Sequence, residues 1–311
     1  MTAPERVTIS EVSLRDGLQI EAAILPTGAK VALAGALADA GLTCIEATGF
    51  VHPKVIPQFA DAEAVMAALP RRPGLRYAAF VPNERGAERA VAAGVDLKCG
   101  VAASDRFNAL NVRMTTEQGM QSIGGIARVA AGTGSRIVGV VATAFGCPYE
   151  GAVDPNRVDR LFAQMQELGS PVTYLADTTG MADPGAIRRT VERLRRRWPE
   201  ARIGLHLHNT RGLGLANALA GLDVGIRDFE SSIGGLGGCP FAPLAVGNVC
   251  TEDFVHMLGA MNFETRINLD RLLDAARLAQ NLVGRTLPGM VLKAGKASER
   301  HEAAERESKL G

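Results

Sequence analysis

Two histidines separated by one residue close a predicted strand, in the stretch 206–212 that reads HLHNTRG. Residues 201–205, ARIGL, form the short apolar run of a buried strand. Because residues i and i+2 of a strand point to the same face, His206 and His208 can reach one point. Two imidazoles at such a point predict a metal site. The alternative is that one histidine packs in the core and the other bonds a backbone carbonyl.

Other polar residues follow or lie in predicted strands far away in the chain. Arg15 and Asp16 come after the first strand, Glu46 lies in the second, and Asp177 ends the sixth. A carboxylate from Asp16 beside two imidazoles, with no thiolate, favours a hard divalent cation such as Mg²⁺ or Mn²⁺. Two simpler roles stay open: Arg15 and Asp16 as a plain ion pair, and Asp177 as a cap of the next helix.

A glycine-rich segment, GGLGGCP at residues 234–240, follows the last predicted strand. Four glycines in five residues favour a loop that moves or lies very close to a ligand. Cys239 at its tip carries a thiol that can act as an acid or a base. A tight turn with a buried cysteine is the alternative.

The positions of these residues depend on a repeated strand–helix pattern. Segments with helical periodicity, such as 30–41 and 158–169, alternate with short apolar strands, and several end in a glycine typical of a helix C-terminus (Gly41, Gly94, Gly169). This pattern predicts βαβ units and a parallel sheet. The eight predicted strands are 6–12, 43–49, 75–81, 95–101, 136–142, 171–177, 201–208 and 226–232.

Eight units at this spacing match the size of an α/β protein with a (β/α)8 barrel. A doubly wound sheet is the alternative, but the turn after the first strand lacks GxGxxG. Extra helices are predicted after the barrel, at 251–258 and 269–283, within a domain spanning 1–292. Residues 293–311 form a charged, weakly apolar tail that we expect to be loosely ordered. In such barrels the active site lies at the carboxyl ends of the strands.

Composition excludes several classes of function. The chain has 311 residues, of which 47% are hydrophobic, with 34 basic and 33 acidic residues. This balance argues against binding to nucleic acid or to a membrane surface. The five cysteines are odd in number and lack CxxC spacing, which favours the reducing cytoplasm. No apolar run is long enough to insert the chain into a membrane or export it.

Six motifs in order together carry a resemblance to a known family. The chain resembles the 3-hydroxy-3-methylglutaryl-CoA lyase family of barrel metallolyases, from about residue 5 to residue 285. The motifs are EVSLRDGLQ (11–19), IEATGFVHPKVIPQ (45–58), GCPYEG (146–151), ADTTG (176–180), HLHNTRG (206–212) and GLGGCPFAPLAVGNVCTED (235–253).

The resemblance implies a reaction and a role for each matching residue. The enzyme would cleave 3-hydroxy-3-methylglutaryl-CoA to acetyl-CoA and acetoacetate, as in leucine degradation, and would be a homodimer. Arg15 would hold the thioester carbonyl, and Cys239, or His206 beside the metal, would transfer a proton. Glu46 and Asp177 would support the arginine and the substrate. The implied Mg²⁺ or Mn²⁺ ligands are Asp16, His206, His208 and Asn248, and the implied substrate-binding residues are Arg15, Gln19, Asn209 and Arg211.

Three departures keep alternatives open. Asn209 and Arg211 stand where the family has Asp and Tyr, and Lys98 stands where it has an apolar residue. The first two could suit another 3-hydroxyacyl-CoA, such as citramalyl-CoA or a longer branched analogue. A condensing synthase of the same superfamily, a metal-free aldolase with Lys98 as a Schiff base, and a non-catalytic acyl-CoA-binding barrel are further alternatives.

Overall fold

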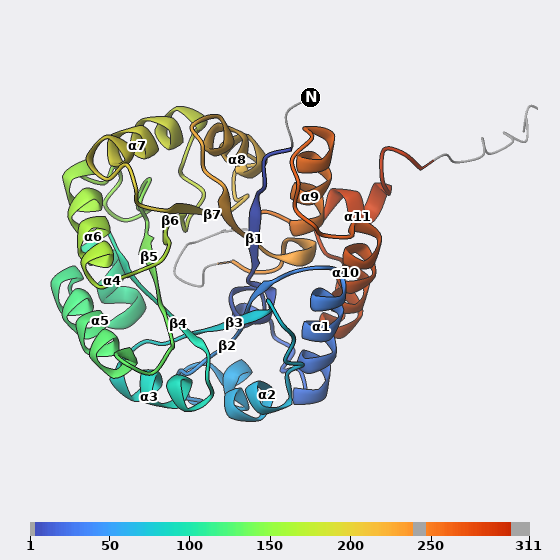
Figure 1. Ribbon diagram of the computed structural model, residues 1–311, viewed down its shortest axis with the longest axis horizontal. Coiled ribbons are helices and arrows are strands. Elements are labelled where there is room, and N and C mark those ends of the chain that lie inside the picture. Colours follow the sequence, from blue (N-terminus) through green and yellow to red (C-terminus); the bar gives the residue numbers. More distant parts are fainter. Residues whose placement is uncertain (1–3, 239–246, 300–311) are drawn as a thin grey trace, which may run out of the picture.

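Eight parallel strands close into a barrel in sequence order, with β8 paired to β1 (Figure 1). The computed structural model describes residues 4–238 and 247–299. Each predicted strand is present, with bounds within two residues of those expected. The (β/α)8 barrel is therefore confirmed. The strands are β1 Thr8–Glu11, β2 Cys44–Gly49, β3 Arg76–Phe80, β4 Asp96–Ala102, β5 Ile137–Ala142, β6 Thr173–Asp177, β7 Ile203–Leu207 and β8 Asp228–Ser231.

The helices surround the barrel, and most of them bury one face (Figure 1). The helix α6 shows the pattern, because Val158, Leu161, Phe162 and Met165 recur at helical spacing and are all buried. The helices are α1 Thr27–Asp39, α2 Ala62–Ala68, α3 Glu84–Ala92, α4 Asp105–Val112, α5 Thr116–Ala130, α6 Pro155–Glu167, α7 Pro184–Arg197, α8 Gly214–Asp223, α9 Thr251–Ala260, α10 Leu269–Val283 and α11 Met290–Ala294.

The helix boundaries follow local signals in the sequence. The Asp154 side chain accepts a hydrogen bond from the Asn156 amide at the start of α6, where Pro155 needs no partner. The predicted glycine ends are confirmed, since Gly41, Gly94 and Gly169 all have positive φ. These caps set the lengths of the helices and hence the loops that carry the site.

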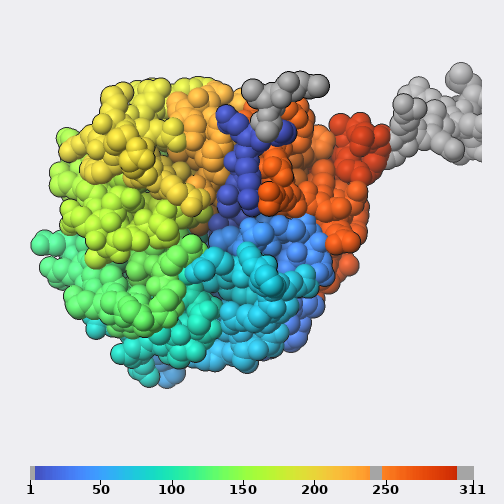
Figure 2. Space-filling model, viewed as in Figure 1, coloured from blue at the N-terminus to red at the C-terminus, as the bar shows by residue number. Residues whose placement is uncertain are grey.

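The C-terminal helices complete the ring. The helix α10 packs against α1 and α9, so the end of the chain covers its beginning. Figure 2 shows the same order on the surface: blue, cyan, green and yellow segments follow one another around the molecule, and the orange and red helices lie beside the blue ones. Among the described residues, no helix combines the length and the apolar character needed to cross a membrane. The division into a domain of 1–292 and a tail of 293–311 stays a prediction.

Charged side chains fill part of the barrel interior. Glu46, Lys98, His206 and Glu230 come from four different strands, and each is at most 6% exposed. The register of β7 against β8 places Glu230 beside His206. Buried charges are tolerated only when they are paired and hydrogen-bonded, so this interior must form a defined network.

Candidate metal and active site

The two histidines of HLHNTRG converge as predicted. His206 lies in β7, and His208 follows the strand and forms an isolated bridge with Asn248. Their Nε2 atoms are 3.1 Å apart, and both residues are buried. The i, i+2 spacing on the strand thus brings two imidazole nitrogens to one point at the carboxyl end of the barrel.

Asp16 reaches the same point from the loop after β1, the strand that closes the barrel by pairing with β8. A tight π-helical turn, Ser13–Gly17, follows β1, and the amides of Arg15, Asp16 and Gly17 all donate to the Val12 carbonyl. One ligand atom each of Asp16, His206 and His208 lies within 4.8 Å of the others. Burial would raise the pKa of Asp16, but the positive charge of Arg15 and the hydrogen bond from Asn248 hold it well below its usual range.

Asn248 adds an oxygen to this group. Its Nδ2 donates to Asp16 Oδ2 over 2.8 Å and to the Leu236 carbonyl over 3.0 Å. Its Oδ1 is buried and accepts no hydrogen bond from any residue in 4–238 or 247–299. A buried amide oxygen without a donor is costly unless something else satisfies it.

These four side chains suit a hard divalent cation. They offer two imidazole nitrogens, a carboxylate held ionised and an amide oxygen, and no thiolate. Mg²⁺ and Mn²⁺ prefer such oxygen and imidazole ligands. The orphaned Asn248 oxygen is satisfied if it coordinates the same ion as Asp16 and the histidines, so the residues present fit the predicted metal.

Arg15 lies directly beside the metal-binding group. Its Nε donates to Glu46, its Nη1 lies 3.1 Å from Asp16 Oδ1, and its guanidinium stacks 4.9 Å from the centre of the Phe80 ring. Burial would lower the pKa of Arg15, but Glu46 and Asp16 raise it above the ordinary value. The guanidinium is therefore a fixed cation next to the ligands. The simpler role as an ion pair with Asp16 is also observed.

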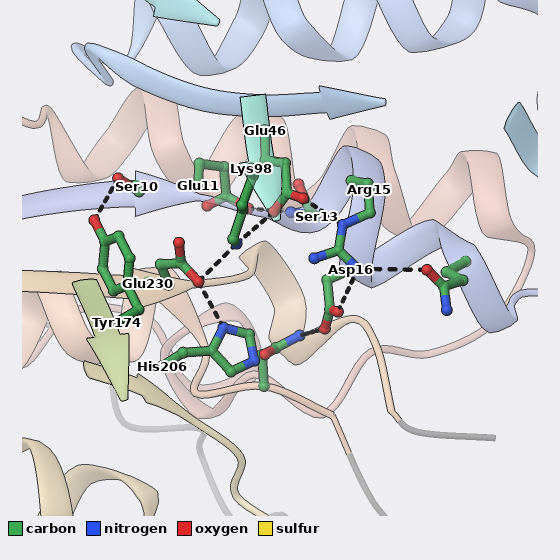
Figure 3. Close-up of polar contacts among 12 residues, drawn as sticks. Ser10, Glu11, Ser13, Arg15, Asp16, Glu46, Lys98, Tyr174, His206 and Glu230 are labelled. Atoms are coloured by element: carbon green, nitrogen blue, oxygen red, sulfur yellow. Dashed lines mark hydrogen bonds and ion pairs between the residues drawn. The ribbon is translucent and has the colours of Figure 1, made fainter. Parts of the chain in front are cut away.

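The interior charges connect Arg15 to His206 (Figure 3). Glu46 uses its second oxygen to accept from Lys98 Nζ over 2.6 Å. The same Nζ donates to Glu230 Oε2 over 2.8 Å, and that oxygen lies 2.8 Å from His206 Nδ1. This contact directs the opposite ring nitrogen of His206 toward the other ligands.

The surroundings of Lys98 disfavour the Schiff-base alternative. A nucleophilic lysine must lose its proton, which requires a lowered pKa. Burial would lower the pKa of Lys98, but the negative charges of Glu230 and Glu46 outweigh it and raise the pKa. Lys98 is thus held as an ammonium.

Asp177 is the last residue of β6, and its two carboxylate oxygens differ in their hydrogen bonds. Its Oδ1 accepts from the Met181 and Ala182 amides over 2.7 and 3.1 Å, so it organises the loop before α7, close to the simpler role considered from the sequence. Its buried Oδ2 has no hydrogen-bond partner among the described residues. Burial raises the pKa of Asp177 to about 6. The carboxyl can therefore exchange a proton near neutral pH.

The predicted substrate-binding residues differ in how they are held. Gln19 Oε1 lies 3.4 Å from Arg15 Nη1, which places it beside the arginine. Asn209 Oδ1 accepts from the Gly214 amide over 3.0 Å and so shapes the turn into α8. Arg211 Nη1 donates to the Thr179 and Gly180 carbonyls, which joins the loops after β6 and β7. Cys239, the predicted proton donor, lies outside the described residues.

Close packing requires glycine at Gly237, before Cys239, and at Gly247, after it. A Cβ on Gly237, whose φ is +113°, would lie 2.5 Å from Asn248 Nδ2 and 3.3 Å from Asp16 Oδ2. A Cβ on Gly247 would lie 1.8 Å from the Gly235 carbonyl oxygen. The GGLGG segment thus presses its backbone against the metal-binding group, and this contact explains part of its glycine content.

Several residues of the site were missed in the sequence. Glu230 and Phe80 contact the predicted residues directly. Glu11 is buried and accepts from the Ser13 and Ile233 amides and the Thr251 hydroxyl, so it ties β1 to the loop after β8. The acidic residue at an interior position of the short strand DFES was a usable signal for Glu230. No local signal distinguishes Phe80 from an ordinary core aromatic.

Glu252, also missed, anchors the start of the glycine-rich segment. Both of its oxygens lie 3.0 Å from the Gly234 amide, and the residue is fully buried. Burial raises the pKa of Glu252 to about 7. The folded protein therefore binds more protons here than the unfolded chain, whose glutamate titrates near 4.3.

This raised pKa predicts a pH-dependent stability. The contribution of Glu252 is fully present below about pH 4.3 and is lost as pH rises to about 7, by about 4 kcal/mol in total. Glu252→Gln, which mimics the protonated carboxyl, should lose this dependence. Urea unfolding of the two proteins from about pH 5 to pH 8 measures the difference, with the exposed Glu88→Gln as a control for the change of charge. Equal pH slopes in the wild type and Glu252→Gln would contradict the prediction.

The closed barrel, the candidate metal site at its carboxyl end and the adjacent, largely buried arginine define a barrel enzyme of the metal-site class. Comparisons with known proteins agree with this class. The model of the HMGL-like family matches residues 6–279. The chain therefore belongs to the HMGL-like family.

Individual relatives narrow the comparison. The chain is 40% identical to hydroxymethylglutaryl-CoA lyase YngG of Bacillus subtilis, over 96% of this chain and all of the relative. It is 39% identical to an (R)-citramalyl-CoA lyase of Chloroflexus aurantiacus, over 94% of this chain and 95% of the relative. Among solved structures, an HMG-CoA lyase from Acinetobacter baumannii in complex with coenzyme A and 3-methylmalate matches with a TM-score of 0.93 and 42% identity, covering 97% of this chain and all of the other.

Proposed function

We propose that this protein is a carbon–carbon lyase that cleaves 3-hydroxy-3-methylglutaryl-CoA to acetyl-CoA and acetoacetate. The observation that carries the proposal is the largely buried Arg15 cation directly beside the Asp16, His206 and His208 group. The relatives named as hydroxymethylglutaryl-CoA lyases support the reaction, and the coenzyme A complex of one of them supports an acyl-CoA substrate.

Asp16, His206, His208 and Asn248 would hold the divalent cation. When bound there, Mg²⁺ or Mn²⁺ supplies Lewis acidity toward the substrate's C3 hydroxyl, which makes its proton easier to remove. Glu230 orients His206 through the bond to Nδ1, and Arg15 keeps the Asp16 carboxylate ionised. These contacts hold the ligands in place before substrate arrives.

Arg15 would bind the thioester carbonyl. When the bond between C2 and C3 breaks, the electron pair passes to C2 and the leaving fragment is the enolate of acetyl-CoA, while C3 becomes the ketone of acetoacetate. A cation already fixed by Glu46 and the Phe80 ring stabilises that developing charge with little reorganisation.

Proton transfer would involve groups on both sides of the substrate. Cys239, or His206 beside the metal, donates the proton that converts the enolate to acetyl-CoA. Asp177, with its free oxygen and raised pKa, is suited to accept the hydroxyl proton. Gln19 and Arg211 would contact the substrate, and Asn209 would act by shaping the turn next to Arg211.

The same chemistry on a related 3-hydroxyacyl-CoA is the second candidate. The (R)-citramalyl-CoA lyase relative is nearly as similar as the hydroxymethylglutaryl-CoA lyases. Arg211, at the mouth between the loops after β6 and β7, adds a positive charge that could favour a differently placed substrate carboxylate.

The test is acetoacetate release from 3-hydroxy-3-methylglutaryl-CoA by the purified protein, with Mg²⁺ or Mn²⁺ and with EDTA. Fast release that EDTA stops and that Cys239→Ala strongly reduces is the expected result. Citramalyl-CoA is assayed in parallel, with pyruvate as the detected product. If kcat/KM for citramalyl-CoA exceeds kcat/KM for 3-hydroxy-3-methylglutaryl-CoA, citramalyl-CoA becomes the proposed substrate. No turnover of either would overturn the proposed reaction.

We further propose that the protein works in the cytoplasm as a homodimer, in leucine degradation. The four cysteines in the described part of the chain, Cys44, Cys99, Cys147 and Cys250, are all free thiols, which suits a reducing compartment. Sedimentation of the purified protein tests the dimer. Growth of the source cells on leucine, with and without the protein, tests the pathway.

A further inference from the structure

Lys98 lies inside the barrel as a buried cation between two acids. It projects from the middle of β4 and is 3% exposed. Its Nζ lies 2.6 Å from Glu46 Oε2 and 2.8 Å from Glu230 Oε2, with the Tyr174 ring 6.0 Å away. Figure 3 shows the ammonium between the two carboxylates, with a dashed line to each.

Each of these two carboxylates also holds a residue of the candidate site. Glu46 accepts from Arg15 through its other oxygen. Glu230 bonds His206 Nδ1 through the same oxygen that accepts from Lys98. The cation thus links β2 to β8 across the barrel, and with them the arginine to the first histidine.

We propose that Lys98 is a positioning residue that sets the orientation of Arg15 and of the His206 ring at the same time. The role of the oriented groups rests on the proposed function. The contacts of Lys98 with Glu46 and Glu230, called the Lys98 clamp below, are a property of the apoprotein. Lys98 donates to Glu46 and to Glu230, so the two carboxylates stay side by side and each keeps its second partner.

The physical reason is the proximity of two carboxylates in a water-poor interior. Without the ammonium, Glu46 and Glu230 lose the donor that they share, and the two carboxylates move apart. If Glu46 moves, Arg15 loses the acceptor of its Nε. If Glu230 moves, the His206 Nδ1 contact is lost and the ring is free to rotate. Either change disturbs a group at the metal-binding end without touching the substrate.

A second buried lysine, in one of the helices around the barrel, provides a matched control. Lys30 in α1 is also 3% exposed, and its Nζ bonds Asp61 Oδ1 and the Gln58 carbonyl, each over 2.5 Å. Removing either ammonium leaves a carboxylate without its partner and costs stability. Only Lys98 adjoins residues that contact Arg15 and His206, so only its removal should change the site.

The experiment compares Lys98→Met and Lys98→Gln with Lys30→Met. Mn²⁺ dissociation constants are measured by titration of the apoproteins, kcat and KM with 3-hydroxy-3-methylglutaryl-CoA, and Tm by calorimetry. Both Lys98 variants should lose about 10- to 100-fold in Mn²⁺ affinity or in kcat, with a smaller change in KM. Lys30→Met should lower Tm by a similar amount and keep both quantities within about twofold of the wild type. The glutamine variant serves if the methionine variant does not fold.

The outcomes separate the clamp from the reaction. Lys98 variants whose Mn²⁺ affinity and kcat stay within about twofold of the wild type, or fall no further than in Lys30→Met, would overturn the proposal. If the wild type does not cleave the substrate, the proposed function fails. The Mn²⁺ affinity then decides the role of Lys98 alone, since a loss of about fivefold or more supports the clamp and a smaller loss overturns it.

Discussion

Replacing His206 by alanine is expected to lower kcat for cleavage of 3-hydroxy-3-methylglutaryl-CoA by about 1,000-fold or more. The variant removes one of the ligand atoms gathered within 4.8 Å and leaves Glu230 without the ring that it orients. A metal that acts as a Lewis acid supplies several kcal/mol of transition-state stabilisation, and each 1.36 kcal/mol is a factor of ten. Steady-state kinetics at saturating Mn²⁺ measure the loss, and titration of Mn²⁺ should show a parallel loss of affinity.

The control is another histidine outside the barrel mouth. His256 lies in α9, and its Nε2 accepts from the Ala297 amide over 3.3 Å. His256→Ala should keep kcat and Mn²⁺ affinity within about twofold, since its loss is a surface change. A His206→Ala variant that retained more than about a tenth of the wild-type kcat and bound Mn²⁺ normally would show that His206 is not a ligand.

Replacing Arg15 by glutamine is expected to lower kcat by about 100- to 1,000-fold while the metal still binds. In the proposed reaction the guanidinium binds the thioester carbonyl, where charge develops, and removing one such donor has an effect of this size. The loss should fall on kcat more than on KM, because the interaction strengthens as the enolate forms. Mn²⁺ affinity should change by less than about tenfold, since Asp16 and the histidines remain.

The matched control is Arg202→Gln. Arg202 pairs with Asp228 over 2.6 Å at the opposite, amino-terminal end of the barrel. The substitution therefore removes the partner of a buried acid without reaching the site. Its kcat should stay within about twofold of the wild type. An Arg15→Gln variant with near-normal kcat would contradict the role of the guanidinium, and one that lost Mn²⁺ binding as severely as His206→Ala would assign Arg15 to the metal site instead.

Much of the fold could be predicted because its signals are local. Strands such as β5, IVGVVA, are short apolar runs. Helices such as α6 bury positions that recur at helical spacing, among them Val158, Leu161 and Phe162. The glycine ends at Gly41, Gly94 and Gly169 depend only on the backbone of their own turn. The i, i+2 spacing of His206 and His208 also needs only the geometry of one strand.

The distant members of the site needed more than local signals. Asp16 joins the histidines because the barrel closes through β8, and the order of strands could be predicted once eight units were counted. The roles of Asn209, Arg211 and Asp177 depend on which loops meet at the mouth. In the structure, Asn209 and Asp177 hold neighbouring amides and Arg211 holds neighbouring carbonyls.

The sequence by itself determined the strands, the helices, the barrel and the paired imidazoles, because hydrophobic period and side-chain direction are properties of short segments. Only the tertiary structure decided that Lys98 lies between Glu46 and Glu230, that Glu230 bonds His206, and that the Asn248 oxygen lacks a donor among the described residues. These contacts join strands that are far apart in the chain. The register of the closed sheet and the burial of its interior decide which charges meet. Both are properties of the whole barrel and cannot be predicted from a single segment.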